Sequence, residues 1–255
     1  MIMKTYKYET HLHTCQGSAC GVSSGDEYIE AFFNAGYSGI FVTDHFFGGN
    51  TAASAEDPWE KRVEIYCSGY EVAFAAAEEF NKKHGLTGTD DEFKVFFGLE
   101  QTFNGDDYLV YGPDKAFLLA HPEIEGMRHK ELFDLADGMK GLMIQAHPFR
   151  LRDYIKSIHV HPRDVHGVEV YNGGNKPTEN ELAYLYASQY NFPMTSGSDI
   201  HNVNFLIEES ARVAKGGNAV GGMEFETPLK SVFDYAQRIK NKEGKLIGNN
   251  YERKI

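Results

Sequence analysis

The sequence predicts an α/β fold built as one domain from repeated strand–helix units. Short apolar runs alternate with helical patterns from one end of the chain to the other, which is typical of a parallel sheet covered by helices. The length of 255 residues suits a single α/β barrel. The composition, 42% hydrophobic and 24% charged, is that of a globular protein and argues against a disordered chain.

The predicted strands are short apolar runs bounded by polar or turn-forming residues. They are expected at Tyr6–Thr10, Gly39–Thr43, Lys94–Leu99, Leu142–Gln145, Gly167–Tyr171 and Met194–Ser196, with a hairpin arm near Tyr108–Tyr111. Most are followed by a helical pattern, so parallel pairing is expected.

The predicted helices have recognisable ends. They are expected at Asp26–Asn34, Trp59–Lys83, Lys130–Met139, Thr178–Tyr190 and Leu229–Asn241. Pro58 and Pro228 stand near two of the starts, and Gly36 follows one of the ends, as helix termini favour. No linker divides the chain, so one domain is expected over 1–255, with the helix and strand of 226–248 completing the barrel.

The charge balance limits the ligands that the chain can bind. The formal net charge is -12, and no run of Lys or Arg offsets it. A broad electrostatic grip on a nucleic acid is therefore not expected, beyond nucleotides or short ends. A phosphate group would need a local positive centre, which bound metal ions can supply.

Cysteine content and hydropathy indicate the compartment. Three cysteines, Cys15, Cys20 and Cys67, are an odd number in a chain too long to need disulfides, which favours a reducing environment. The first ten residues are polar, and no stretch approaches the length of a membrane span. A cytoplasmic protein without a membrane partner is expected.

Histidines and carboxylates directly follow five predicted strands. His11 and His13 are one residue apart, so an extended chain points both imidazoles to the same face, where one ion can bind both. The other four places are Thr43-Asp44-His45, Leu99-Glu100, Ala146-His147 and Ser198-Asp199-Ile200-His201. One such fragment alone would be read as a surface or capping residue. Five together favour a shared site, because parallel strands of a barrel end on one rim.

The ordered motifs HLHT, TDH, GLE, QAHP and SGSDIH resemble those of the PHP (polymerase and histidinol phosphatase) family. They run from Glu9 to His201 and leave the C-terminal part uncovered. The resemblance implies a distorted (β/α)7, TIM-like barrel with metal ions at its C-terminal rim, usually zinc, manganese or iron.

The resemblance also implies residue roles. The ligands of the first two ions would be His11, His13, Glu100, His147 and Asp199, with Glu100 as the bridge and Asp199 on the first ion. His45 and His201 would serve a third ion, and Asp44 would support the neighbouring ligand or handle a proton.

The chain departs from the family pattern at two places. Family members carry a further His or Asp after HxH, and often a His after the strand of the bridging Glu, and neither is found here. Two to three ions are therefore expected, with the third site in question. Cys20 is a substitute ligand in one interpretation, since a thiolate suits zinc, and a small buried residue in the preferred one.

Other polar residues near the motifs are given lesser roles. His159, His161 and His166 precede a predicted strand, so a solvated loop away from the site is expected. Glu169 and Asn172 end the fifth strand an odd step apart, so at most one of them is expected to face the site.

The predicted activity is hydrolysis of a small phosphate mono- or diester by a metal-activated hydroxide. Arg150, three residues past His147, is expected to grip phosphate oxygens or, alternatively, to form a loop ion pair. His45, His201 or Asp44 would protonate the leaving oxygen if the third ion is absent. The competing hypotheses are an amidohydrolase-like enzyme and a non-catalytic metal-binding module. The motifs do not identify the phosphate ester or the oligomeric state.

Overall fold

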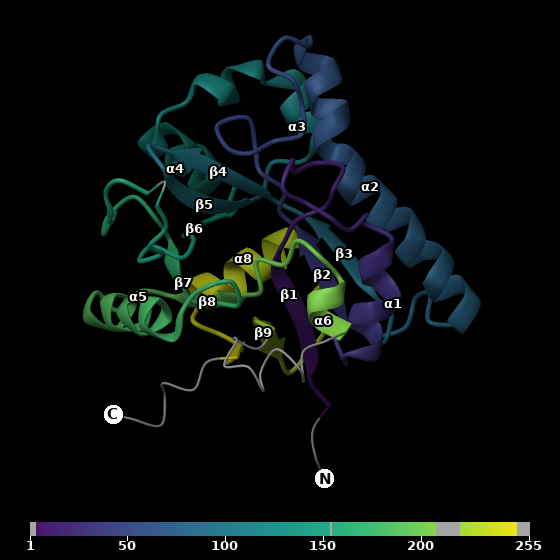
Figure 1. Ribbon diagram of the computed structural model, residues 1–255. Coiled ribbons are helices and arrows are strands. Elements are labelled where there is room, and N and C mark those ends of the chain that lie inside the picture. Colours follow the sequence, from purple (N-terminus) through teal and green to yellow (C-terminus); the bar gives the residue numbers. More distant parts are fainter. Residues whose placement is uncertain (1–3, 154, 208–219, 249–255) are drawn as a thin grey trace.

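The computed structural model describes residues 4–153, 155–207 and 220–248, and it has the expected α/β class (Figure 1). Its strands form two five-stranded sheets, in the orders β10-β9-β1-β2-β3 and β4-β5-β6-β7-β8. The first sheet consists of β1 (Tyr6–Leu12), β2 (Gly39–Val42), β3 (Lys94–Phe97), β9 (Gly222–Phe225) and β10 (Lys245–Ile247). The second consists of β4 (Leu99–Phe103), β5 (Asp106–Tyr111), β6 (Leu142–Gln145), β7 (Gly167–Asn172) and β8 (Met194–Gly197).

The helices lie on the outside of the sheets. They are α1 (Glu27–Asn34), α2 (Trp59–His84), α3 (Lys115–Ala120), the 3-10 helix η1 (Pro122–Gly126), α4 (His129–Gly138), α5 (Pro177–Gln189), α6 (Asn204–Ile207) and α8 (Val232–Lys240). Figure 1 shows α1 and α2 beside β2 and β3, and α5 on the other side of the molecule beside β7. None of the described helices is long and apolar enough to cross a membrane.

The described strands do not form one closed barrel, which corrects the sequence-based expectation. The run Lys94–Leu99, expected as one strand, breaks at Gly98 into β3 and β4, which belong to different sheets. A Cβ atom at Gly98 would lie 3.0 Å from the methyl group of Thr43 and from the ring of Tyr111, so a larger residue would fit only if these side chains shifted. β9, which was not predicted, pairs antiparallel with β1 and carries β10 on its far side. The C-terminal strand therefore extends a sheet edge.

The two sheets nevertheless meet at the carboxyl ends of their parallel strands. An isolated parallel bridge joins Leu12 to Ile200, and a second joins His45 to Glu100. The amide of Glu100 also donates a hydrogen bond to the carbonyl of Asp44 at 3.0 Å. These two seams bring the strand ends that carry the predicted ligands onto one rim, as expected.

A hydrophobic core is shared between the sheets. One cluster takes buried side chains from β1, β2, β5, β6 and α8, among them Tyr8, Phe41, Leu109, Ile144 and Tyr235. A common core favours one domain. The single domain over 1–255 stays a prediction.

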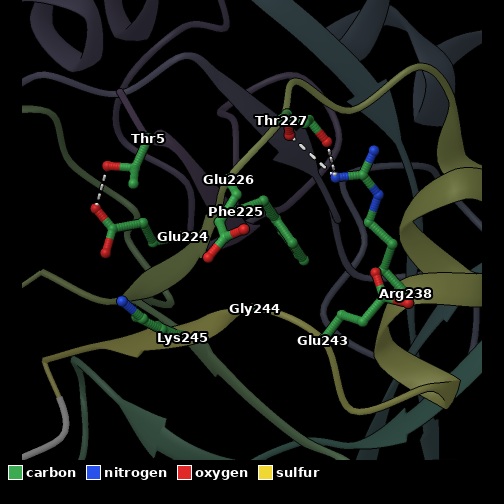
Figure 2. A pocket seen from close by; sticks show the side chains of 9 residues that line it. All are labelled: Thr5, Glu224, Phe225, Glu226, Thr227, Arg238, Glu243, Gly244 and Lys245. Carbon is green, nitrogen blue, oxygen red and sulfur yellow. Dashed lines mark hydrogen bonds between the residues drawn. The ribbon is translucent and has the colours of Figure 1, made fainter. Parts of the chain in front are cut away.

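A cavity of about 690 Å³ lies beside β9 and β10 (Figure 2). Its walls include Glu224, Phe225, Arg238 and Lys245. Arg238 donates hydrogen bonds to the carboxylate of Asp234 and is thereby occupied. None of the groupings of metal-ligand side chains found among the described residues lies here.

A half-buried histidine outside the rim gives the fold a pH dependence. His129, the first residue of α4, stacks on the ring of His161 at 4.1 Å between centroids and lies 4.5 Å from that of Tyr108. Burial, together with a smaller effect of the neighbouring His161, lowers the pKa of His129 to about 4. The unfolded chain therefore binds a proton at this position at a higher pH than the folded chain.

We expect His129 to lower the free energy of unfolding when the solution is acidified. Its contribution is intact above about pH 6.5, the unfolded pKa, and is lost as the pH falls toward 4. His129→Gln should flatten the fall in the free energy of unfolding over this range, measured by urea unfolding at a series of pH values. The exposed His121 serves as the control, because His121→Gln should keep the wild-type slope. An unchanged slope in His129→Gln would contradict the prediction.

Candidate metal centre

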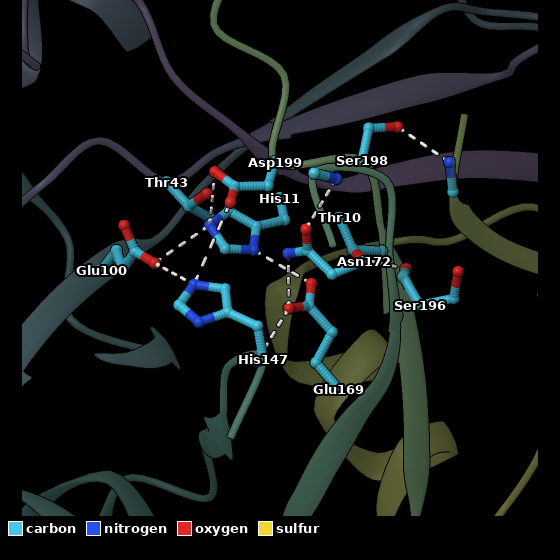
Figure 3. Close-up of polar contacts among 12 residues, drawn as sticks. Thr10, His11, Thr43, Glu100, His147, Glu169, Asn172, Ser196, Ser198 and Asp199 are labelled. Carbon is cyan, nitrogen blue, oxygen red and sulfur yellow. Dashed lines mark hydrogen bonds and ion pairs between the residues drawn. The ribbon is translucent and has the colours of Figure 1, made fainter. Parts of the chain in front are cut away.

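The end of β1 brings four ligand-type side chains together. His11 and His13 are buried, and their Nε2 atoms face each other at 3.1 Å. The Nε2 of His11 lies 3.1 Å from Glu100 Oε1 and 3.5 Å from Asp199 Oδ1. The Nε2 of His13 lies 3.4 Å from Glu100 Oε2 and 3.2 Å from Asp199 Oδ1. Figure 3 shows His11, Glu100 and Asp199 pointing toward one another.

These separations fit the coordination shell of one cation. Four ligands placed tetrahedrally about 2.1 Å from a metal ion stand roughly 3.4 Å from one another. The two Nε2 atoms lie 3.1 Å apart, and each lies 3.1 to 3.5 Å from an oxygen of Glu100 and from an oxygen of Asp199. Two imidazoles and two carboxylates are also a donor set that zinc and other divalent ions accept. The residues present therefore fit the metal that the sequence predicts.

Hydrogen bonds on the far side of each ring direct the free nitrogens to the centre. The Nδ1–H of His11 donates to Glu169 Oε1 at 2.9 Å, and that of His13 donates to Ser18 Oγ at 3.1 Å. Each Nε2 then faces the carboxylates and, once deprotonated, can bind a cation. The hydroxyl of Ser18 in turn donates a hydrogen bond to Asp44 Oδ1 at 2.6 Å.

The charge of the cluster follows from burial and from its neighbours. Burial would raise the pKa of Glu100, but the imidazoles of His45 and His11 outweigh it and hold that pKa well below its usual range. Burial opposes a charge on His11, yet the carboxylates of Glu169 and Asp199 raise its pKa well above the ordinary value. The centre is thus a concentration of negative charge, which attracts a cation.

Glu100 also connects the first group to a second one. Its Oε1 lies 3.2 Å from His147 Nε2, so one carboxylate faces histidines on both sides. His147 has φ +30° and Asp199 has φ +55°, which are left-handed values rare in side-chain-bearing residues. Such positions cost about 1 to 3 kcal/mol each and occur where a site fixes the backbone. The bridging position implied for Glu100 is compatible with this arrangement.

Asp107 completes the second group, and the sequence analysis missed it. The carboxylates of Asp107 and Glu100 and the imidazole of His147 lie close enough to hold one ion, with Asp107 Oδ2 3.9 Å from His147 Nε2. The rule that sites follow the carboxyl ends of strands failed here because β5 runs antiparallel, so its first residues reach the rim. The usable signal was the pair Asp106-Asp107 at the head of that strand.

We expect Asp107→Asn to weaken binding of one ion at least about tenfold, because the second group then loses a charged ligand. The number of ions retained per chain after gel filtration, and a titration against a coloured chelator, measure this loss. Asp106→Asn is the matched control, since the Asp106 carboxylate accepts a hydrogen bond from His159 away from the cluster. Equal metal binding by the two variants would remove Asp107 from the ligand set.

Glu169 and Asn172 both face the site, so the expectation that at most one does is wrong. The register of β7 against β8 shifts between Glu169 and Tyr171, and this irregularity cancels the alternation of side chains. Glu169 accepts hydrogen bonds from His11 Nδ1, from Asn172 Nδ2 at 2.8 Å and from the amide of His147 at 3.1 Å (Figure 3). It therefore holds two of the predicted ligands in place.

A third group lies beside the first. Ligand atoms of His13, His45 and His201 all lie within 4.8 Å of one another. The Nδ1–H of His201 donates to the carbonyl of Asp199 at 3.0 Å, which leaves the Nε2 of His201 as the ring nitrogen without this hydrogen bond. The half-buried Cys20 faces this group. Burial would raise the pKa of its thiol, but hydrogen bonds with His201 and His45 outweigh burial and lower the pKa to about 6.

Asp44 supports the site from behind. Its carboxylate accepts hydrogen bonds from the amide and hydroxyl of Thr14, both at 2.7 Å, and from Ser18. Burial raises the pKa of Asp44 to about 6 against these hydrogen bonds. With its oxygens engaged in this way, Asp44 fits the supporting role better than that of a proton donor in contact with a substrate.

Arg150 reaches the rim from the segment after β6. Its Nη2 donates to Asp199 Oδ2 at 2.5 Å and to Asn172 Oδ1 at 2.8 Å, and its Nε donates to Asn175 Oδ1 at 2.8 Å. The ion pair that the sequence analysis allowed is therefore present. These bonds leave Nη1 as the nitrogen for a substrate, and the phosphate contact stays a prediction.

The other histidines lie off the site. His159 pairs with Asp106 at 2.6 Å. His166 accepts a hydrogen bond from the amide of Met143 through Nδ1. The His159-Val-His161 repeat of the HxH pattern thus has no part in the groups found among the described residues.

Comparisons with known proteins give the fold. Neither a protein-family model nor a curated protein matches the sequence. A two-domain protein of Bacteroides vulgatus, containing a predicted PHP-like metal-dependent phosphoesterase, aligns with 96% of this chain at 17% identity and a TM-score of 0.63. This chain spans only 65% of its length.

Two further solved structures are similar. PsfC of Pseudomonas syringae has a TM-score of 0.55 at 14% identity, over 98% of this chain and 93% of its own. A candidate metal-dependent phosphoesterase of Bifidobacterium adolescentis has a TM-score of 0.50 at 14% identity, over 76% and 87%. The class is thus an α/β fold with histidines and carboxylates on one rim. Within that class, this chain has a PHP-type fold.

Proposed function

We propose that this chain is a metal-dependent phosphoesterase that hydrolyses a small phosphate mono- or diester. The spacing of His11, His13, Glu100 and Asp199 carries the proposal, because the Nε2 atoms of the two histidines lie 3.1 Å apart and 3.1 to 3.5 Å from carboxylate oxygens of Glu100 and Asp199, as ligands of one ion would. The likeness to folds described as metal-dependent phosphoesterases supports it. Two to three divalent ions, zinc, manganese or iron, are proposed as cofactors.

The ions would lower the pKa of a water molecule and neutralise charge on the phosphate oxygens. Arg150 would bind the substrate, and hydrogen bonds to Asp199 and Asn172 hold its Nη2 in place. His45 and His201, with 16% and 25% of their side chains exposed, are the most exposed histidines of these groups and are the proposed proton donors to the leaving oxygen when no third ion is bound to them.

The partner that we propose is a small phosphorylated molecule. The net charge of -12 disfavours a long nucleic acid, whereas a nucleotide or a short end remains compatible. A cytoplasmic location remains a proposal that rests on the cysteine pattern.

Metal content and turnover test the proposal together. Protein purified without chelator is analysed for bound elements, and hydrolysis of p-nitrophenyl phosphate, bis-p-nitrophenyl phosphate and p-nitroacetanilide is followed before and after chelation. We expect at least two ions per chain and ester hydrolysis that chelation abolishes and added metal restores. Hydrolysis of the anilide alone would favour an amidohydrolase, and metal binding without turnover of any of the three would favour a binding module.

A further inference from the structure

Glu9 is a buried carboxylate directly beneath the first ligand group. It stands two residues before His11 on β1, so the side chains of both residues point to the same face of the strand. Glu9 has no exposed surface. A carboxylate without access to water is costly unless it is hydrogen-bonded, so Glu9 must find its hydrogen-bond donors within the protein.

The donors to Glu9 come from the backbone around two of the predicted ligands. Glu9 Oε1 accepts hydrogen bonds from the amide of His11 at 2.8 Å and from the amide of Ser198 at 2.9 Å. Glu9 Oε2 accepts a third hydrogen bond, from the hydroxyl of Ser198. Hydrogen bonds from backbone amides to a carboxylate are among the stronger ones in proteins. One side chain therefore holds both His11 and the residue that precedes Asp199.

This connection lies where the backbone itself provides little order. β1 and β8 belong to different sheets, so they do not pair side by side in a ladder. Asp199, which follows β8 by two residues, has φ +55°, a left-handed value that residues with side chains rarely adopt. By fixing Ser198, Glu9 holds the backbone in the position from which the Asp199 carboxylate reaches His11.

We propose that Glu9 is a positioning residue, which fixes His11 and Asp199 at the spacing that one ion requires. The Nε2 of His11 and Oδ1 of Asp199 lie 3.5 Å apart although the two residues come from different sheets. Glu9 is not a ligand, because both of its oxygens are engaged by His11 and Ser198. It arranges the ligands before an ion binds, so less conformational freedom is lost on binding. The inference rests on the metal binding of the proposed function and not on hydrolysis.

Zinc affinity tests the proposal without any substrate. The metal-free full chain is titrated with zinc in competition with a coloured chelator, and the free energy of unfolding of each metal-free variant is measured alongside. Glu9→Ala should weaken one stepwise zinc affinity by about tenfold to a hundredfold, as loss of a residue that orients ligands does. Glu9→Gln should recover most of this loss, because its amide oxygen can still accept the two backbone hydrogen bonds.

Thr10→Val is the matched control. The hydroxyl of Thr10 donates to the carbonyl of Ser196 at 2.6 Å, so it also connects β1 to β8, but it holds neither His11 nor Asp199. Its loss should lower the free energy of unfolding and leave each zinc affinity unchanged. A loss of zinc affinity in Thr10→Val equal to that in Glu9→Ala would show that any weakening between the two strands has the same effect.

That result would overturn the proposal, as would wild-type affinity in Glu9→Ala or a Glu9→Gln chain that binds zinc no better than Glu9→Ala. If Glu9→Ala does not fold, Ser198→Ala takes its place. This variant removes only the hydroxyl donor and should weaken the same affinity about threefold to tenfold, so an unchanged affinity would contradict the proposal. A wild-type chain that binds no zinc would overturn both this inference and the proposed function. If zinc affinity depends on Glu9 but no ester is hydrolysed, the positioning role stands and the proposed function fails.

Discussion

Turnover of a phosphate ester is expected to fall at least about a thousandfold, or roughly 4 kcal/mol, when Glu100 is replaced by Gln. The Glu100 carboxylate faces His11, His13 and His147 at 3.1 to 3.4 Å, so one substitution affects both of the first two groups. An amide keeps the shape but removes the charge that compensates two cations. Loss of metal from both groups should accompany the loss of rate.

Elemental analysis and turnover at saturating metal separate the two effects in this variant. Glu92→Gln is the control, since the same chemical change then occurs at a carboxylate that pairs with Lys94 away from the rim. If Glu100→Gln kept both its ions and its rate, the bridging role would be wrong, and with it the geometry that carries the proposed function.

The second large effect is expected at Arg150. Arg150→Ala should lower kcat/KM for a phosphate ester by about a hundredfold to a thousandfold, because the charged fork that faces the substrate is lost. Arg150 is 14% exposed and bonded to Asp199, so its loss also leaves that carboxylate without its cation. Arg150→Lys keeps the charge but not the fork and should recover only part of the rate.

Arg152→Ala is the matched control for this variant. Arg152 lies two residues after Arg150 and pairs with Glu179 at 3.0 Å, away from the ligand groups. Its removal should leave kcat/KM within about threefold of the wild-type value. An unchanged KM with a weaker metal affinity in Arg150→Ala would show that Arg150 acts by positioning Asp199. Unchanged kcat/KM for the ester would remove Arg150 from substrate recognition altogether.

The sequence predicted which side chains gather on one rim wherever they follow a parallel strand. His11, His147 and Asp199 were placed by that rule, and the structure brings them to one rim. The rule depends only on strand direction, which alternating apolar and helical segments reveal without any knowledge of sheet order.

The parts that were missed depend on pairing between distant segments. Asp107 reaches the rim because β5 is antiparallel, and Glu169 turns inward because β7 and β8 shift in register. The break at Gly98 lies where the side chains of Thr43 and Tyr111 approach the backbone closely. Asp107 left one local signal, the pair Asp106-Asp107. The register shift and the contacts at Gly98 leave no local pattern, so one sequence without its relatives could not reveal them.

The two isolated bridges between the sheets have a consequence for how the chain unfolds. His11 lies in the first sheet, and His13 and His45 follow strands of that sheet. Glu100 lies in the second sheet, and His147 and Asp199 follow its strands. Ions held between them would fasten the two halves where backbone pairing is limited to isolated bridges. The free energy of ion binding would then make the two sheets unfold more cooperatively. Without ions, amide hydrogens at the rim should exchange with solvent through local opening, while those of the shared core exchange only when the whole chain unfolds.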